Sequence, residues 1–284
     1  MWLNLIGQIA IIVTGGLVRL TGSGLGCSTW PMCEPGQFTP QFHEAATYHP
    51  FVEFGNRTMS GVLTLLGIFV LLAVWTDRSR AQSYRRWGLV PLIGVLLQAV
   101  IGGITVLIEL HPAVVGFHML ISVALVAASA YLVQRQSEGD GPAQHNVDGP
   151  TRTTVYALGV WLIPVIVLGV LVTGSGPHSG DEEIGYRFAL DPAAMARVHA
   201  MSVWVFIALL LVATLMLLRR THSAPALLRR RITWLWALVL LEGVVGYVQY
   251  FTGLPAGLVA VHMLLAATLT AVGTLAVTAT RSRV

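Results

Sequence analysis

The 284-residue sequence contains no lysine, so its seventeen basic side chains (Lys or Arg) are all arginines. Charged residues make up only 11% of the chain, less than half of the roughly 25% usual in soluble domains. Hydrophobic residues supply 55%, and 29 glycines add to the apolar share. So little charge excludes a disordered chain, a nucleic-acid-binding module and an ordinary soluble enzyme. The composition predicts a polytopic membrane protein.

Long apolar runs define the expected fold. A helix needs about 20 mostly apolar residues to cross the hydrocarbon core of a bilayer. Eight stretches qualify, approximately 2–19, 52–75, 87–108, 113–134, 153–173, 192–218, 231–251 and 256–279. The first has no basic residue before it and no small-residue cleavage site after it, so we interpret it as a retained span and not as a signal peptide. The fold class is therefore predicted to be an all-α polytopic membrane protein with eight transmembrane helices.

The arginines predict the orientation, because cytoplasmic loops collect basic residues. Thirteen of the seventeen lie in segments that would share one side of the membrane: 76–86, 135–152, 219–231 and the C-terminal tail. Both termini are then cytoplasmic. The exceptions, which would lie at the outer face, are Arg19, Arg57, Arg187 and Arg197.

The sequence contains an internal repeat. Leu96-Leu97-Gln98 and His118-Met119-Leu120 recur 144 residues later as Leu240-Leu241-Glu242 and His262-Met263-Leu264, and Thr-Gly-Ser-Gly occurs at both 21–24 and 173–176, in each case directly after an expected span. The repeat predicts two tandem pseudo-symmetric four-helix bundles, related by an axis along the membrane normal. Their predicted bounds are 1–134 and 153–284, joined by a flexible polar cytoplasmic linker at 135–152.

Each even-numbered span carries one polar residue several positions inside its outer end. The four are Asn56, His118, His199 and His262. Ionisable groups inside a membrane are functional by default, and facing imidazoles in a helical bundle suit the axial ligation of haem iron. Hydrogen bonding between helices is the alternative for the histidines. A zinc site is less favoured, because two histidines lack the further ligands of a tetrahedral site.

Other polar residues near these positions have two possible interpretations each. Arg57 and Arg197 would either extend to the interface or pair with haem propionates. Glu53 lies on the same helix face as Asn56, and it has no counterpart in the second half, which favours chemistry in the first half over a solvated surface carboxylate. Glu242 is either a proton-relay group or a protonated, hydrogen-bonded packing residue.

The only two cysteines, Cys27 and Cys33, lie in the first outer loop. An oxidising compartment predicts a disulfide between them, with two unrelated thiols as the alternative. The histidines of the outer loops are expected to be solvated; they are His43, His49, His111 and His178.

Together these features resemble bacterial haem A synthase. The resemblance covers nearly the whole chain and is carried by Gly-Gly-Leu-Val-Arg-Leu-Thr-Gly-Ser-Gly-Leu-Gly-Cys at 15–27, by Cys33 and Glu53, and by the histidines at 118, 199 and 262. It implies an oxidoreductase that oxidises a ring methyl of haem O to a formyl group by way of hydroxylation. The product is haem A for terminal oxidases. The resemblance further implies that His199 and His262 ligate a haem b cofactor, that the first half binds haem O, and that Glu53 is the essential carboxylate.

One residue departs from the family pattern, which reads Glu-x-x-His where this chain has Glu53-x-x-Asn56. An amide is a poor iron ligand, so the substrate iron is expected to be held by His118 with an open or weak sixth position, near Asn56 and Arg57. The expected electron acceptor is a quinone, and the expected partners in the cell membrane are haem O synthase and terminal oxidase assembly factors. The alternatives are a b-type electron-transfer protein and a haem carrier without substrate chemistry.

Overall fold

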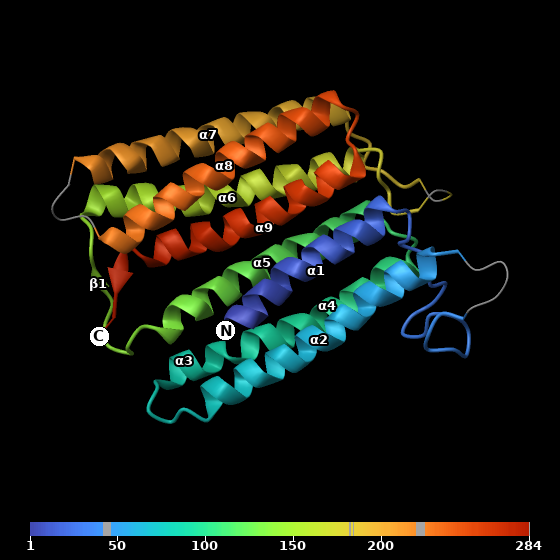
Figure 1. The fold of residues 1–284 in the computed structure, drawn as a ribbon, viewed down its shortest axis with the longest axis horizontal. Helices are drawn as coiled ribbons and strands as arrows, with labels where there is room; N and C mark the ends of the chain where they lie inside the picture. Colours follow the sequence, from blue (N-terminus) through green and yellow to red (C-terminus); the bar gives the residue numbers. More distant parts are fainter. Residues whose placement is uncertain (42–46, 182, 184, 220–224, 284) are drawn as a thin grey trace.

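A computed structural model describes residues 1–41, 47–181, 183, 185–219 and 225–283 of the chain. Its helices are long and run nearly side by side (Figure 1). They are α1 (Trp2–Leu20), α2 (His49–Trp75), α3 (Gln82–Trp87), α4 (Leu89–Leu107), α5 (Pro112–Gln136), α6 (Gly149–Ser175), α7 (Pro192–Leu218), α8 (Ala226–Phe251) and α9 (Ala256–Thr278).

Eight of these segments, with α3 and α4 taken together as Gln82–Leu107, are long and apolar enough to cross a membrane. This confirms the predicted eight-span helical class, and the chain is a multi-pass membrane protein. Several spans begin with proline in the first turn, as in α2, α5, α6 and α7. Proline is favoured there because its fixed φ suits the helix and its missing N–H would lack an intrahelical partner anyway.

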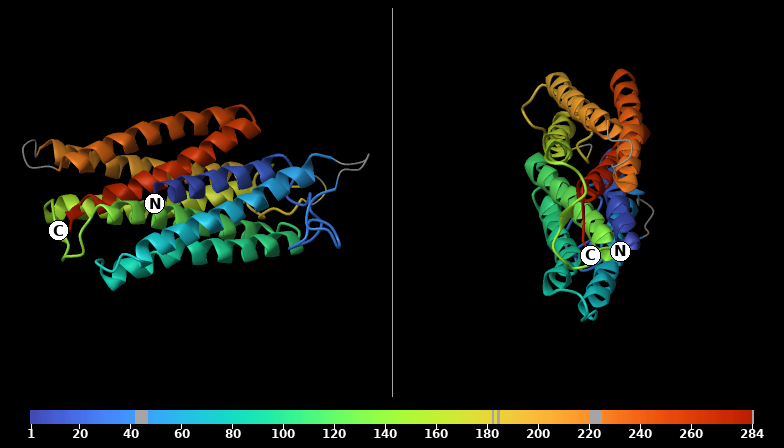
Figure 2. Two further views of the ribbon diagram at one scale, coloured as in Figure 1. Left: turned by 60° about the horizontal axis from the view of Figure 1, so that its bottom comes forward. Right: turned by 90° about the vertical axis from the view of Figure 1, so that its left-hand side faces the viewer.

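The helices pack in two groups of four. In the first group α1 packs against α2, α2 against α4, α4 against α5, and α5 back against α1; in the second, α6 to α9 close the same ring. Figure 2 shows the blue-to-green group beside the green-to-red group. These contacts favour the two predicted four-helix bundles and their boundaries, which we retain as a proposal.

The two groups meet through α1 and α5 on one side and α9 and α6 on the other. A buried apolar cluster fills this contact, with Leu5 and Ile12 from α1, Val126 from α5, and Ala267 and Ala271 from α9 among its members. The side chains are small where the helices approach closely: a Cβ on Gly16 of α1 would lie 2.6 Å from the sulfur of Met263 on α9. The bundles are therefore packed against one another along much of their length.

Both termini lie at one end of the molecule, with the segments that connect α2 to α3 and α5 to α6, the end of α7 and the start of α8 (Figure 1). This is the end at which the sequence gathers its arginines. The common side of the termini agrees with the predicted topology, while the assignment of that side to the cytoplasm stays a prediction.

The connection between the halves is more ordered than the flexible linker that the sequence suggested. Helix α5 continues to Gln136 and α6 begins at Gly149, which leaves a shorter connection than 135–152. Within it, β1 (Gln144–His145) pairs antiparallel with β2 (Arg281–Ser282), in the register Gln144 to Ser282. The linker is thereby fastened to the C-terminal end of the chain.

A second attachment joins the linker to the first half. The carboxylate of Asp140 accepts hydrogen bonds from Arg80 (Nε, 2.9 Å), Arg135 (Nη2, 2.7 Å) and the backbone N–H of Ala81 (2.6 Å). These hydrogen bonds, that from Arg80 above all, lower the pKa of Asp140 to about 2. Arg135 also pairs with Glu138 at 3.0 Å. Polar bonds at the arginine-rich end therefore fix the connection between the bundles.

Candidate functional site

Each of the four polar side chains predicted at matched depth lies against a glycine of the preceding long helix. A Cβ built on that glycine would fall within 3.4–3.8 Å of the polar side chain. The pairs are Asn56 with Gly15, His118 with Gly102, His199 with Gly169, and His262 with Gly246. These are ordinary van der Waals distances, so a methyl group would fit there, and each glycine leaves space beside the ring or amide. The repeat seen in the sequence is therefore present in the side-chain packing.

The backbone repeats as well. Leu110 and Leu254 follow α4 and α8 in the two halves, and both adopt the left-handed conformation at φ 60°. Each donates its N–H to the carbonyl five residues earlier, Leu110 to Thr105 at 2.8 Å and Leu254 to Gln249 at 2.7 Å. The same turn thus places the start of α5 and of α9, and with it His118 and His262.

The other shared motif differs between the halves. Thr21-Gly22-Ser23-Gly24 follows the end of α1, with Gly22 at φ 66°. In the second half, Thr173-Gly174-Ser175 instead forms the last turn of α6. The prediction that both motifs come directly after a span is wrong for the second, because α6 is 27 residues long and α1 only 19.

In the second half the structure brings the two predicted ligands together. The ring centres of His199 and His262 lie 6.4 Å apart, with the ring planes at 82°. With metal–nitrogen bonds of about 2.0–2.1 Å, two imidazoles on opposite sides of one ion would have their centres about 6 Å apart. The two rings therefore have a separation that suits shared axial ligation.

The protonation of His199 also suits a ligand. Its Nδ1 lies 3.1 Å from the carbonyl oxygen of Val165 on α6. A carbonyl can only accept, so Nδ1 carries the proton and Nε2 keeps a free lone pair. Among the described residues, no group of three or more histidine, cysteine or carboxylate side chains could hold a metal ion. The pair is thus better suited to an ion whose other ligands come with it, as in a haem, than to zinc.

In the first half the matching positions are not paired in this way. The Oδ1 of Asn56 accepts a hydrogen bond of 2.7 Å from the hydroxyl of Thr14 on α1. The Nδ1 of His118 is buried and has no hydrogen-bond partner within the described part of the chain. No ring contact or hydrogen bond joins Asn56 and His118 among those residues, so this half offers one imidazole and one amide already occupied by a threonine.

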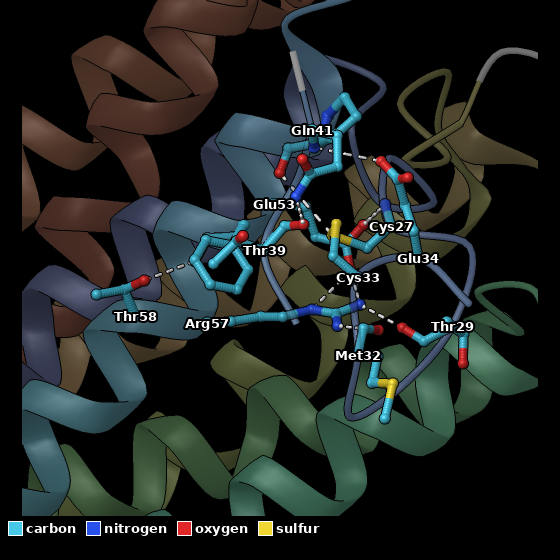
Figure 3. Close-up of a disulfide and its surroundings, with 12 residues drawn as sticks. Cys27, Thr29, Met32, Cys33, Glu34, Thr39, Gln41, Glu53, Arg57 and Thr58 are labelled. Carbon is cyan, nitrogen blue, oxygen red and sulfur yellow. Dashed lines mark hydrogen bonds and ion pairs between the residues drawn. A yellow bond between two sulfur atoms is a disulfide. The ribbon is translucent and has the colours of Figure 1, made fainter. Parts of the chain in front are cut away.

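Glu53 is buried, with only 5% of its surface exposed, which excludes the solvated alternative. One carboxylate oxygen accepts the backbone N–H of Cys27 at 2.7 Å, and the other is paired with the guanidinium of Arg57. Arg57 in turn donates to the carbonyls of Met32 (3.1 Å) and Thr29 (3.0 Å) (Figure 3). The arginine predicted to contact the substrate thus already binds Glu53 and the outer loop.

The predicted disulfide is confirmed. Cys27 and Cys33 are bonded to one another with their Cα atoms 4.4 Å apart, and neither residue is exposed. Figure 3 shows the disulfide loop folded over Glu53 and Arg57. The loop therefore covers the outer end of the first-half site and contributes backbone groups to it.

Trp30, within that loop, was not predicted as a site residue. Its indole ring lies so close to Gly103 of α4 that any side chain there would overlap it, and Gly103 follows the glycine that faces His118. Two signals in the sequence could have indicated this contact: the aromatic residue between the cysteines and the adjacent glycines 102 and 103. The contact of Thr14 was not predicted either, because a threonine within a helix does not indicate in the sequence which amide it binds.

The remaining outer-face residues have varied surroundings. Arg197 is exposed on α7, and Arg19 donates to the carbonyls of His178 (2.7 Å) and Thr173 (2.9 Å), which ties the first half to the second. Two histidines expected to be solvated have partners: His49 Nδ1 with Ser23 Oγ, and His178 Nε2 with the carbonyl of Leu254, each at 2.9 Å. His111 is exposed, and His43 lies outside the described residues.

The chain matches a known family. The family model COX15-CtaA, described as cytochrome oxidase assembly protein, matches residues 1–178. Curated proteins named heme A synthase are similar to the chain: it is 26% identical over 171 residues to one from Geobacillus kaustophilus and 29% identical over 174 residues to one from an Exiguobacterium species. These alignments cover 59% and 60% of this chain and 53% and 56% of the relatives.

A heme A synthase from Staphylococcus aureus is 24% identical over 195 residues, which cover 65% of this chain and 60% of the relative. The chain thus spans about half the length of the first curated relatives that it matches. The family match contains the whole first half and α6, whereas α7, α8 and α9 lie beyond it.

Proposed function

The chain belongs to the COX15-CtaA family of cytochrome oxidase assembly proteins, and from this premise we propose that it oxidises a ring methyl of haem O to a formyl group, giving haem A. The observation that carries the proposal is the asymmetry of two otherwise matched sites. The second half holds two imidazoles and no paired carboxylate at the position of Glu53, where it has Ala196. The first half holds one imidazole and a buried Glu53–Arg57 pair.

We propose that His199 and His262 hold a haem b. The fit rests on their 6.4 Å separation, on the proton of His199 being held by Val165, and on the two glycines beside the rings. A haem held by both imidazoles would supply single-electron transfer at this site. The carbonyl of Val165 and the carboxylate of Glu242 would orient the two rings.

The first half is the proposed substrate site. His118 would bind the iron of haem O, since its ring faces Gly102 and its Nδ1 makes no competing hydrogen bond with the described residues. Asn56 is a weaker ligand, and its oxygen is already bound to Thr14. A single strong ligand would hold the substrate without saturating its iron. Arg57 and the exposed Arg197 stay candidates for contacts with propionates.

Glu53 is the proposed catalytic residue. With water as the oxygen donor, conversion of the methyl to the formyl group (CH3 + H2O → CHO + 4 H+ + 4 e−) releases four protons and four electrons. A fixed carboxylate at the site can accept protons, and two quinone molecules would take the electrons. The N–H of Cys27 and the guanidinium of Arg57 hold the carboxylate in one orientation. The disulfide loop fixes both of these donors, so it would act on the reaction by positioning Glu53.

The cellular setting follows from the same proposal. The positive-inside rule assigns the arginine-rich end to the cytoplasm, and the site then lies towards the outer face of the cell membrane. Haem O synthase would supply the substrate, terminal oxidase assembly would consume the product, and a quinone would be a suitable membrane-soluble electron acceptor.

Extraction of the pigment tests the function. The protein is co-expressed with a source of haem O, and its non-covalent haems are separated by chromatography. We expect haem A beside haem b. Recovery of haem b and unchanged haem O would support a haem carrier, and recovery of haem b alone would support an electron-transfer protein. Either result would overturn the proposal.

A further inference from the structure

Glu242 is a buried carboxylate in the middle of α8, with 8% of its surface exposed. Its Oε2 lies 2.5 Å from Nδ1 of His262 on α9. The two atoms are in ion-pair contact without the geometry of a hydrogen bond, and neither has a hydrogen-bond partner in the described part of the chain. A carboxylate inside a membrane span is costly unless it interacts with a partner, and the imidazole of His262 is the partner that the structure provides.

The three histidines differ in what lies at Nδ1. His199 has a backbone carbonyl there, His262 has a carboxylate, and His118 has nothing among the described residues. The residue of the first half that matches Glu242 is Gln98, whose amide nitrogen donates to the carbonyl of His118 (2.9 Å) and to Ser122 (2.5 Å). The carboxylate–imidazole contact is thus specific to the half with two histidines.

We propose that Glu242 is a positioning residue for the haem b ligand His262, which fixes the ring and lowers the reduction potential of the haem. This inference rests on the proposed haem b site. Metal-bound histidines commonly direct their second nitrogen at a carboxylate, which sets the tautomer, orients the ring and makes it a stronger donor. A proton held at Nδ1 by Glu242 leaves the lone pair on Nε2, as the carbonyl of Val165 does for His199.

The carbonyl of Val165 and the carboxylate of Glu242 predict that the two imidazoles differ in donor strength. A backbone carbonyl is neutral and a carboxylate carries a charge, so the contact with Glu242 should make the imidazole of His262 the more basic of the two. A more basic imidazole stabilises ferric more than ferrous iron, because the ferric ion carries the greater charge. Hydrogen bonds to axial ligands are one of the means by which proteins set haem potentials. Glu242 therefore favours the oxidised haem.

The test is Glu242→Gln in the full-length protein, purified with haem b from cells without haem O. The variant keeps the side-chain size and loses the charge. We expect low-spin haem b with a raised midpoint potential. Loss of such a metal-site partner typically costs 10–100-fold in affinity, and a tenfold loss confined to the ferric state corresponds to about 59 mV for one electron.

Gln98→Glu is the matched control, because it adds a carboxylate at the corresponding place in the other half. Its haem b potential should equal that of the unaltered protein. An equal rise or fall in both variants, or no change in Glu242→Gln, would overturn the inference. His262→Ala separates this failure from that of the proposed function: haem b that survives His262→Ala refutes the site, whereas haem b lost in His262→Ala but unchanged in Glu242→Gln refutes only the role of Glu242.

A second readout covers the case in which Glu242→Gln does not fold. The infrared difference spectrum between reduced and oxidised protein should contain a carboxylate band that responds to the haem. Glu242→Asp keeps the charge and shortens the side chain, so this band should shift in position. A spectrum in which Glu242→Asp changes no carboxylate band would contradict the proposal.

Discussion

The two halves of the molecule have the same helix order and the same glycine behind each polar side chain, yet they restrain these side chains by different means. In the second half, Nδ1 of each histidine faces an acceptor on the helix before it, Val165 for His199 and Glu242 for His262. In the first half, a hydrogen bond of Thr14 occupies Asn56, and His118 has no such partner among the described residues. Among the described residues, one half of the repeated fold thus holds two histidines that each face an acceptor at Nδ1, and the other holds a single histidine without one.

The loops that follow α1 and α6 also differ between the two halves. The first loop closes a disulfide and donates the N–H of Cys27 to Glu53. In the second half, the acceptors of Arg19 are the carbonyl of Thr173 at the end of α6 and that of His178 in the following loop, so these contacts join the halves. A mobile substrate needs a covered site with a fixed reactive group, whereas a resident cofactor needs only rigid ligands. The first loop therefore suits the proposed substrate site, and the second loop suits the proposed cofactor site.

The largest effect is expected from Glu53→Gln, which removes the carboxylate at a position where the second half has Ala196. Haem A formation should fall by about 100- to 10,000-fold, the usual contribution of a positioned acid–base group, while haem b content stays unchanged. Glu34→Gln, in the same outer loop, is the control and should retain activity. Near-normal haem A formation by Glu53→Gln would remove the chemical distinction between the halves.

His199→Ala should remove one of the two proposed haem b ligands in the second half and leave the first half intact. Loss of a partner that only hydrogen-bonds to a metal ligand typically lowers metal affinity about 10–100-fold. Loss of a ligand itself should therefore lower the content of low-spin haem b by about tenfold or more. The haem-to-protein ratio and the visible spectrum of the purified variant measure this. Unchanged low-spin haem after both His199→Ala and His262→Ala would refute the assignment of the ligands.

Asn56→His should make the first half resemble the second. In protein with His199 and His262 replaced and with haem O added, we expect a high-spin spectrum that becomes low-spin on Asn56→His, because a second imidazole would complete the iron coordination. The hydrogen bond from Thr14 would be lost as well. A spectrum that is low-spin from the outset and insensitive to His118→Ala would show that the substrate binds elsewhere.

Removal of the disulfide should weaken the first half only. The seven-residue loop closed by Cys27 and Cys33 should contribute about 2–3 kcal/mol on the chain-entropy estimate. Cys27→Ser with Cys33→Ser should therefore lower the melting temperature modestly and reduce activity through Glu53, with haem b retained. Two reactive thiols in the unreduced, denatured protein would contradict the disulfide itself.

The smallest effect concerns the connection that both halves share. The pKa of Asp140 is lowered from 3.8 to about 2 in the folded state, so its contribution to stability is complete above about pH 4 and is lost as the pH falls towards 2. Because the group is partly exposed, we expect about 1 kcal/mol or less. Melting curves of Asp140→Asn should show this loss already at neutral pH and a flatter dependence between pH 4 and pH 2.

Much of the fold could be predicted because the bilayer imposes simple requirements. Span length and arginine placement follow from hydrocarbon thickness and charge alone, so the eight helices and the common side of the termini were recovered. Helix ends were less predictable: α6 includes Thr173 to Ser175, which the motif Thr-Gly-Ser-Gly suggested would be loop. Local residues do not determine where a helix ends when packing can extend it.

The sequence by itself determined the repeat, the matched polar positions, the pairing of Cys27 with Cys33 and the contrast between Asn56 and His199, because these depend on order and residue type. Only the tertiary structure decided that Arg57 binds Glu53 and the loop, that Trp30 lies on Gly103, and that Glu242 faces His262. Each of these contacts joins different elements or depends on how helices are rotated about their axes. Hydrophobicity places a helix in the membrane, but the packing of its neighbours fixes which of its side chains meet.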